Sequence, residues 1–356
     1  MTLEDLGFNN YFENYIIDNN LKDFDIGRVI AEHKELYIIK TLKGDFEAEI
    51  TGNLRYTAKG REDYPAVGDW VLITIYDNNF ALIHKILPRY SIIKRRTPGK
   101  LSDIQVIATN IDYAFIVQSV DRDFNINRLE RYLAICNSAK IIPIIILSKI
   151  DLISELELEN IINKIKSRIT DVPIIPISNK TKDGLDKLKA IIKKGKTYCV
   201  LGSSGVGKST LINTLYGDQI MQTETISESS KKGKHKTTHR ELVILESGGI
   251  LIDNPGMREV GLADINDGLE LTFKNIFEIS ENCKFRDCSH THEIGCAVIE
   301  AVNNGEIDKG AYENYLKMLK EKEFFESTVV ERRKKEKDLS KIVKNYKKFL
   351  KKNKRK

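Results

Sequence analysis

One segment of the chain combines the residue types that bind phosphate groups. It fits the pattern G-x-x-x-x-G-K-[ST] and runs Gly202-Ser203-Ser204-Gly205-Val206-Gly207-Lys208-Ser209-Thr210. Glycines let successive backbone N–H groups point into one cavity, and a helix N-terminus adds partial positive charge. We expect Lys208 to reach the β- and γ-phosphates of a nucleotide and Ser209 to ligate Mg²⁺. An apolar stretch, 198–201, precedes the motif and a helical pattern follows, a setting that favours a phosphate loop over a plain glycine-rich turn.

Two further segments carry groups that could recognise a base. The first, Leu147-Ser148-Lys149-Ile150-Asp151, approximates the pattern [N/T]-K-x-D. A carboxylate at Asp151 can accept from both N1–H and the exocyclic amine of guanine, whereas adenine offers no such pair of donors. Lys149 would lay its methylene groups along the base. Ser148 stands where Asn or Thr is usual, which mildly weakens the match. Taken alone, the segment is better explained as a plain loop at the end of a strand. The second segment, Ile177-Ser178-Asn179-Lys180, is similar to the S-A-K loop that backs guanine in GTPases.

A fourth segment, Leu251-Ile252-Asp253-Asn254-Pro255-Gly256, has the D-x-x-G pattern at the end of an apolar stretch. Asp253 is expected to hold Mg²⁺ through water, and the Gly256 amide to sense a γ-phosphate. The four segments occur in the order base, base, phosphate, switch, whereas ordinary GTPases begin with the phosphate loop. A rotated connectivity preserves the site when all four loops lie at one edge of a shared sheet.

A cluster of cysteines and histidines follows, with the spacing Cys283-x4-Cys288-x-His290-x5-Cys296. Three thiolates and one imidazole suit closed, tetrahedral Zn²⁺ in a structural role. His292 competes for the place of the histidine ligand, and reduced free cysteines are the alternative to a metal site. Two more cysteines, Cys136 and Cys199, lie on apolar stretches and are read as core residues.

These motifs need an α/β layer to position them, and the residues between about 96 and 262 predict one. Apolar stretches at 113–117 and 144–147 are typical of buried parallel strands. Between them, four apolar residues recur at helical spacing, namely Leu129, Tyr132, Leu133 and Cys136.

The flanking regions have other patterns. Residues 1–95 hold short apolar stretches, 35–39, 69–73 and 80–83, with turn residues at Gly44-Asp45 and Gly52-Asn53. About five strands indicate a small barrel, OB-like or SH3-like. A basic segment from Lys94 to Lys100 is interpreted as a linker. Residues 263–356 hold the Cys/His cluster and helical stripes, one of them formed by Tyr312, Tyr315, Leu316 and Leu319. The chain is therefore predicted to be a multidomain α/β protein.

Charge is distributed unevenly along the chain. Residues 331–356 contain 14 Lys or Arg and 3 Asp or Glu, a net charge of +11, so the remainder carries −5 of the total of +6. A basic tail indicates a polyanionic partner such as RNA, while a membrane surface or a solvated helix are the alternatives. The start of the chain has no secretory pattern and the longest apolar run, 141–147, is too short to span a bilayer. A cytoplasmic protein is expected.

The chain resembles, over nearly its whole length, the circularly permuted GTPases that depend on the small ribosomal subunit, the RsgA family (also called YjeQ or YloQ). Besides the motifs, the segments 105–112, 127–133, 233–240 and 253–259 carry this resemblance. It implies an N-terminal OB-fold that contacts ribosomal RNA, a permuted GTPase domain and a C-terminal helical zinc domain with His290 as the ligand. It also implies GTP and GDP as ligands and a role in late maturation of the small (30S) subunit.

The resemblance also directs attention to the loop 233–240, where Thr237 or Thr238 would serve as the switch threonine that ligates Mg²⁺. Met257 follows the D-x-x-G motif, where many GTPases have a glutamine that orients the attacking water. Slow hydrolysis by the free protein is therefore expected. His235 is the first candidate for positioning water once the small subunit orders its loop, an exposed or RNA-contacting residue being the alternative, and His239 is a weaker candidate.

The favoured hypothesis is a monomeric, Mg²⁺-dependent GTPase whose GTP form docks on the small ribosomal subunit. The main alternative is an RNA-binding assembly factor in which bound nucleotide is structural. A membrane-associated GTPase is a third possibility, distinguished by liposome binding through the tail that persists without RNA.

Overall fold

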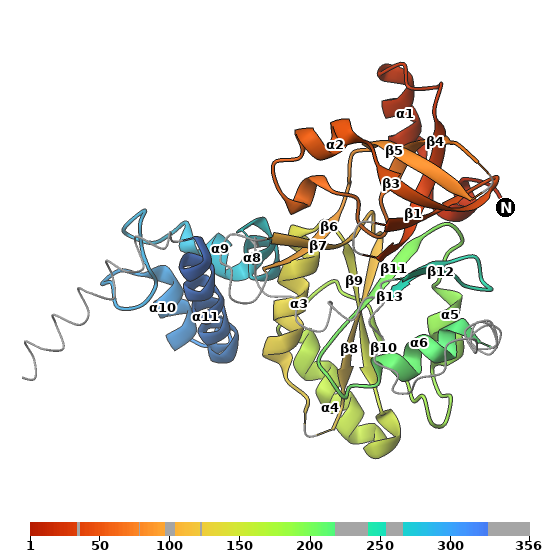
Figure 1. Ribbon diagram of the computed structural model, residues 1–356. Coiled ribbons are helices and arrows are strands. Elements are labelled where there is room, and N and C mark those ends of the chain that lie inside the picture. The colour runs from red at the N-terminus through yellow and green to blue at the C-terminus, as the bar shows by residue number, and fades with distance from the viewer. Residues whose placement is uncertain are drawn as a thin grey trace, which may run out of the picture.

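The computed structural model describes residues 1–33, 36–77, 79–96, 104–121, 123–217, 241–253 and 266–326. A barrel formed by the N-terminal strands lies above a central sheet flanked by helices, and the C-terminal helices pack beside that sheet (Figure 1). Among the described residues, no helix is both long enough and apolar enough to span a bilayer.

The barrel has five strands, which pair in the order β1-β2-β3-β5-β4 and close through β1 and β4. The pair β3–β5 is parallel and the other pairs are antiparallel. This closed five-stranded arrangement is that of the OB-fold, which answers the choice left open by the strand pattern. The strands are β1 (Asp25–His33), β2 (Leu36–Thr41), β3 (Gly44–Ile50), β4 (Trp70–Ile75) and β5 (Phe80–Ile86). The residues predicted to turn at Gly52-Asn53 instead begin a short helix, α2 (Gly52–Thr57).

The central sheet is built from six strands in the order β10-β9-β8-β11-β13-β12, all parallel except β12. Helices α3 (Ile126–Ser138) and α4 (Glu155–Lys166) cover one face, and α5 (Leu185–Ala190) and α6 (Lys208–Tyr216) cover the other (Figure 1). The strands are β8 (Tyr113–Ser119), β9 (Ile142–Ser148), β10 (Ile174–Pro176), β11 (Thr197–Leu201), β12 (Glu241–Ile244) and β13 (Ile250–Asp253). Cys136 and Cys199 are buried in this layer, as predicted.

A two-stranded ribbon joins barrel and sheet: β6 (Ile92–Arg96) pairs with β7 (Ile104–Thr109). The segment interpreted as a basic linker thus begins as a strand, because pairing with β7 satisfies its backbone groups. Strand β1 also pairs with β12 at Ala31 and Glu241, so barrel and central sheet are continuous.

A buried arginine, Arg28 of β1, fastens the barrel to the central sheet. Its guanidinium donates to Thr197 Oγ1 at the start of β11 (2.9 Å), to the Asn110 carbonyl (3.3 Å) and to the Leu6 carbonyl. Leu6 belongs to the N-terminal segment, which contains η1 (Glu4–Leu6) and α1 (Asn10–Asp18) and packs Phe8 and Phe12 against Trp70. Burial lowers the pKa of Arg28 to about 10, so the group stays charged at neutral pH.

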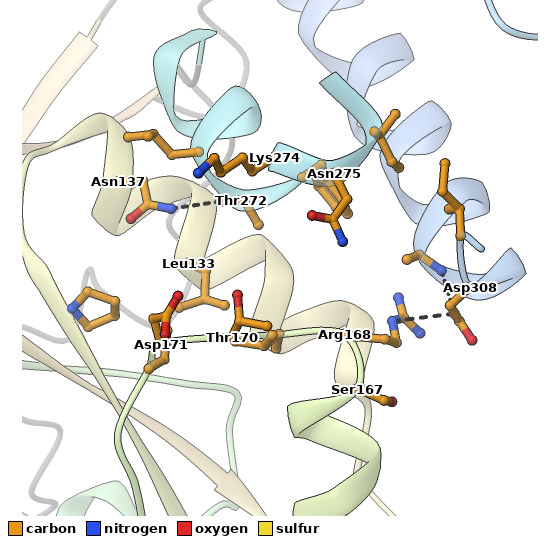
Figure 2. A pocket seen from close by; sticks show the side chains of 18 of the residues that line it. Leu133, Asn137, Ser167, Arg168, Thr170, Asp171, Thr272, Lys274, Asn275 and Asp308 are labelled. Atoms are coloured by element: carbon orange, nitrogen blue, oxygen red, sulfur yellow. Dashed lines mark hydrogen bonds and ion pairs between the residues drawn. The ribbon is translucent and has the colours of Figure 1, made fainter. Parts of the chain in front are cut away.

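The C-terminal helices share a hydrophobic core with the α3 face of the sheet. Glu130 of α3 accepts from Arg168 (2.7 Å) and from Asn314 (2.5 Å), and all three side chains are buried or nearly so. A cavity of about 380 Å³ lies along this interface, with Arg168 near Asp308 at one end and Asn137 bonded to Thr272 at the other (Figure 2). The helices are α8 (Asn266–Thr272), α9 (Lys274–Ser280), α10 (Ala297–Asn303) and α11 (Lys309–Glu326).

Candidate nucleotide site and metal centre

The segments singled out by their residue types meet at one edge of the central sheet. Ser148 ends β9, and Ser178 lies just beyond β10. The phosphate-type loop, residues 202–207, follows β11, and Asp253 ends β13. Because these strands are parallel, their carboxyl ends lie at the same edge, where ligands of open α/β sheets bind. The rotated order of the motifs along the chain therefore still brings them to one place.

Backbone geometry shapes the phosphate-type loop. Gly202 has φ 146°, and a Cβ there would lie 2.4 Å from the carbonyl oxygen of Val117, so no other residue fits between the loop and β8. Gly207 has φ 93° and precedes α6, whose N-terminus receives no hydrogen bond from a capping side chain. The first N–H groups of α6 are thus presented as in an anion site. Lys208 is buried and its Nζ donates to the Ser203 carbonyl, which brings the ammonium group back over the loop.

The two base-type loops, residues 147–151 and 177–180, are joined by a hydrogen bond of Ser178. Its hydroxyl donates to Asp151 Oδ1 (2.6 Å) and accepts from the backbone N–H groups of Lys180 (3.2 Å) and Thr181 (3.1 Å). The carboxylate of Asp151 is exposed at the edge of the sheet, with its position fixed by this bond. A carboxylate that is anchored through one oxygen and exposed to solvent can accept hydrogen bonds from a base that offers two adjacent donors.

The base-type loops are also bonded to the phosphate-type loop. Ser148 Oγ donates to the Val206 carbonyl (2.6 Å), and Asn179 Nδ2 contacts the Gly207 carbonyl at 3.5 Å. Ser148 was interpreted above as a weakened match. In the structure it is completely buried and makes a short hydrogen bond across the site.

One residue of this edge carries no motif and was missed by the sequence analysis. Asp121, in the loop after β8, forms an ion pair with Lys149 (Oδ2 to Nζ, 2.8 Å). A single acidic residue in a polar loop gives no signal in the sequence, because only the pairing of β8 with β9 brings it beside Lys149.

Several predicted site residues lie outside the described part of the chain. They are the D-x-x-G glycine, Gly256, and four residues of the segment before β12, namely His235, Thr237, Thr238 and His239. Met257 and the basic tail lie outside it as well. Ser209 is exposed in the first turn of α6, and Asp253 is half-buried at the end of β13.

The Cys/His cluster is assembled between α9 and α10. The ligand atoms of Cys283, Cys288, His290 and Cys296 all lie within 4.8 Å of one another. His290 Nδ1 is 3.6 Å from the sulfur of Cys283 and 3.5 Å from that of Cys296, and the two sulfurs are 3.9 Å apart. Tetrahedral Zn²⁺ with bonds of about 2.0–2.3 Å needs neighbouring ligand atoms about 3.5–3.8 Å apart. The donor set and its spacing therefore fit a four-coordinate metal.

The surrounding residues hold His290, and not His292, in this cluster. Tyr312 of α11 donates to the His290 carbonyl (2.6 Å), and burial lowers the pKa of His290, which favours the neutral imidazole that metals bind. Glu293 accepts from the N–H groups of Thr291 and His292 (3.0 and 3.1 Å) and so fixes the turn. The ring of His292 is exposed and bonded to Thr291 Oγ1.

Comparison with known sequences agrees with this geometry. A sequence model described as RsgA GTPase matches residues 86–263. A model described as ABC transporter matches residues 185–354, a range that contains the same phosphate-type loop. The chain is 42% identical over 328 residues to the small ribosomal subunit biogenesis GTPase RsgA 1 of Bacteroides thetaiotaomicron, covering 92% of this chain and 91% of the relative. It is 40% identical over 303 residues to the protein of that name from Oceanobacillus iheyensis, covering 85% and 86%.

Two solved structures share the fold. YjeQ from Thermotoga maritima superposes with a TM-score of 0.61 at 25% identity, covering 85% of this chain and 99% of that one. YloQ, described as a circularly permuted GTPase, gives a TM-score of 0.60 at 27% identity, covering 84% and 96%. The predicted family and fold are thereby confirmed, and the chain belongs to the RsgA family of circularly permuted P-loop GTPases.

Proposed function

We propose that the chain binds the small (30S) ribosomal subunit and its RNA, assists late maturation of that subunit, and hydrolyses GTP to GDP and phosphate when the subunit stimulates it. Relatives at 40–42% identity are small ribosomal subunit biogenesis GTPases, which supports this partner. The observation that carries the proposed chemistry is the meeting of base-type and phosphate-type loops at one sheet edge, with Asp151 held by Ser178. Subunit assembly would place the protein in the cytoplasm.

Each loop has a proposed role in binding GTP. The backbone of 202–207 and Lys208 would hold the phosphates, and Asp151 would read guanine while Lys149 covers the base. Ser148, Ile150 and the segment Ser178-Asn179-Lys180 would complete the base site. Gly256 would contact the γ-phosphate. Thr210, which follows Ser209 in α6, would lie beside the phosphates.

Two metals are proposed. Mg²⁺ would be held by Ser209, by Thr237 or Thr238, and through water by Asp253, and it would neutralise phosphate charge. A structural Zn²⁺ would be held by Cys283, Cys288, His290 and Cys296. The fit of the ligand atoms supports the second metal, because all four lie within 4.8 Å of one another. We also propose three domains, 1–95, 96–262 and 263–356, with the first boundary falling within β6 (Ile92–Arg96).

The hydrolytic step needs a group that orients water, and Met257 cannot supply it, since a thioether is only a weak hydrogen-bond acceptor. We propose that His235 orients the water when the chain is bound to the ribosomal subunit. Lys208 would stabilise the negative charge that develops on the phosphates.

The test is turnover of GTP and of ATP by the purified chain, alone, with small ribosomal subunits, and with large subunits as the control. We expect slow GTP turnover, a strong increase with small subunits only, and little ATP turnover. Lys208→Ala should reduce stimulated turnover by about 10²–10³-fold, the usual effect of removing one group that stabilises transition-state charge. Lys164→Ala, an exposed lysine in the last turn of α4, is the matched control and should keep full turnover.

Met257 favours a second candidate, an RNA-binding assembly factor in which nucleotide is structural. Tight GTP binding without stimulation by small subunits would support it over the first, and so would normal subunit maturation in cells that carry Lys208→Ala.

A further inference from the structure

The edge of the central sheet at which the base-type and phosphate-type loops meet is called the nucleotide edge below. The loop after β8 reaches this edge although it contains none of the motif residues. Strand β8 lies beside β9 in parallel register, with Ser119 opposite Ser148. The loop therefore begins level with the first base-type segment. Its Asp121 contacts Lys149 at 2.8 Å, and the side chains are 21% and 33% exposed.

Asp121 is itself held in place by its own loop. Its Oδ1 accepts from Ser119 Oγ (2.9 Å) and from the Asp123 N–H (3.1 Å), and its carbonyl accepts from the Phe124 N–H (2.8 Å). The other carboxylate oxygen, Oδ2, is the one that faces Lys149. The hydrogen bond from Lys149 lowers the pKa of Asp121, so the carboxylate is charged at neutral pH.

Lys149 is constrained at both ends. Its backbone takes the left-handed conformation, with φ 63° and ψ 34°, at the end of β9. Its ammonium group is held by Asp121 at the other end. A lysine in water samples many rotamers and loses this freedom when it binds a ligand, whereas a side chain fixed at both ends has lost most of it beforehand.

We propose that Asp121 is a positioning residue of the guanine site: it holds Lys149 extended, so that the methylene groups of Lys149 form one wall of the base pocket before nucleotide binds. This inference rests on the proposed roles of Lys149 and Asp151 in binding guanine. Asp121 acts through Lys149 on the binding of the base and not on the phosphates, so its substitution weakens the binding of GDP and GTP equally. The loss appears in KM, while kcat at saturating GTP is unchanged.

The test is a double-mutant cycle with Asp121→Ala, Lys149→Ala and the double variant, in which Kd is measured by fluorescence for N-methylanthraniloyl-GDP in excess Mg²⁺. Asp121→Ala should weaken binding about threefold to fivefold, the upper part of the range expected for a partly exposed ion pair. The double variant should bind as Lys149→Ala alone, because Asp121 acts only through Lys149. Asp123→Ala, an exposed carboxylate of the same loop, is the matched control and should bind as the wild type.

Three results would overturn the inference and leave the proposed function standing. They are an unchanged Kd in Asp121→Ala, additive losses in the double variant, which would indicate a general effect on the loop, and a fall in kcat with unchanged KM. If the wild-type chain fails to bind guanine nucleotides, the proposed function is wrong and the inference falls with it. Circular dichroism melting of each variant without nucleotide identifies any loss of folding.

Discussion

The Cys/His cluster and the nucleotide edge differ in how the chain brings their residues together. The cluster takes all its ligand atoms from residues 283–296, a single turn-rich segment between α9 and α10. The nucleotide edge takes its residues from loops after five different strands, spread from Asp121 to Asp253. A local site needs little loop closure and can be held by its ligand, whereas a dispersed site needs the sheet to be formed first.

The two sites also differ in what holds them without a ligand. In the nucleotide edge, hydrogen bonds join one loop to the next, such as Ser148 to Val206 and Ser178 to Asp151. In the cluster, three thiols and an imidazole face one another, and these groups bond poorly without a metal. The nucleotide edge is therefore organised by the protein, and the cluster is expected to be organised by its metal.

Removing one ligand of the cluster should give the largest effect. His290→Ala leaves three cysteines and removes the imidazole that contacts the sulfurs of both Cys283 and Cys296. Mutation of a residue that hydrogen-bonds a metal ligand typically lowers metal affinity by roughly 10–100-fold, and loss of the ligand itself should lower zinc affinity by more. We expect the zinc content of the purified protein to drop from one per chain toward zero. Because metal-binding free energy contributes to folding free energy, the C-terminal helices should melt earlier. Elemental analysis and thermal unfolding with and without a chelator measure both.

His292→Ala is the matched control, because this exposed imidazole lies two residues away and is bonded to Thr291 instead. It should keep one zinc per chain and the melting profile of the wild type. Equal zinc loss in the two variants would contradict the assignment of His290, and full zinc content in His290→Ala would show that the thiolates suffice.

The fold was predicted where its signal is local and was missed where it depends on distant pairing. Short apolar stretches separated by turn residues predicted about five barrel strands, and β1 to β5 are present. Closure of the barrel by β1 and β4 cannot be seen in either strand by itself. Gly52-Asn53 looked like a turn, yet Thr51 caps a helix there by accepting from the Leu54 N–H (3.3 Å). Such a cap is a specific geometric event that composition does not reveal.

The candidate sites show the same division. Motif spacing located both base-type loops, the phosphate-type loop and the Cys/His cluster. Contacts between loops were not predicted, since a motif does not reveal that Ser148 bonds to Val206 in another loop, and Asp121 belongs to no motif. Arg28 is a comparable case, because one arginine among many basic residues proves to be completely buried against β11.

A substitution of Asp151, the carboxylate proposed to read guanine, should give the next largest effect. Asp151→Asn keeps a hydrogen bond to Ser178 but replaces a charged acceptor by an amide that donates from one side. Loss of charge-assisted bonds worth about 1.5–3 kcal/mol each should weaken GTP binding by about 100-fold. Xanthine carries a carbonyl where guanine has its amine, so the amide should favour XTP. Competition between GTP and XTP measures this exchange of base preference.

Unchanged preference for GTP in Asp151→Asn would show that this loop does not read the base. Asp186→Asn, in the first turn of α5, changes one exposed carboxylate away from the site and should leave the competition as in the wild type.

The smallest effect of these three substitutions should come from the bond between the base-type and phosphate-type loops. Ser148→Ala removes the hydrogen bond to the buried Val206 carbonyl and leaves that acceptor without this partner. A bond of this kind contributes about 1 kcal/mol, so GTP affinity should fall about fivefold while preference for guanine is kept. Isothermal titration with GTP and GDP measures the loss, and Ser167→Ala on the surface after α4 is the control. Unchanged or tighter GTP binding in Ser148→Ala would show that the hydrogen bond from Ser148 to Val206 does not prepare this edge of the sheet for nucleotide.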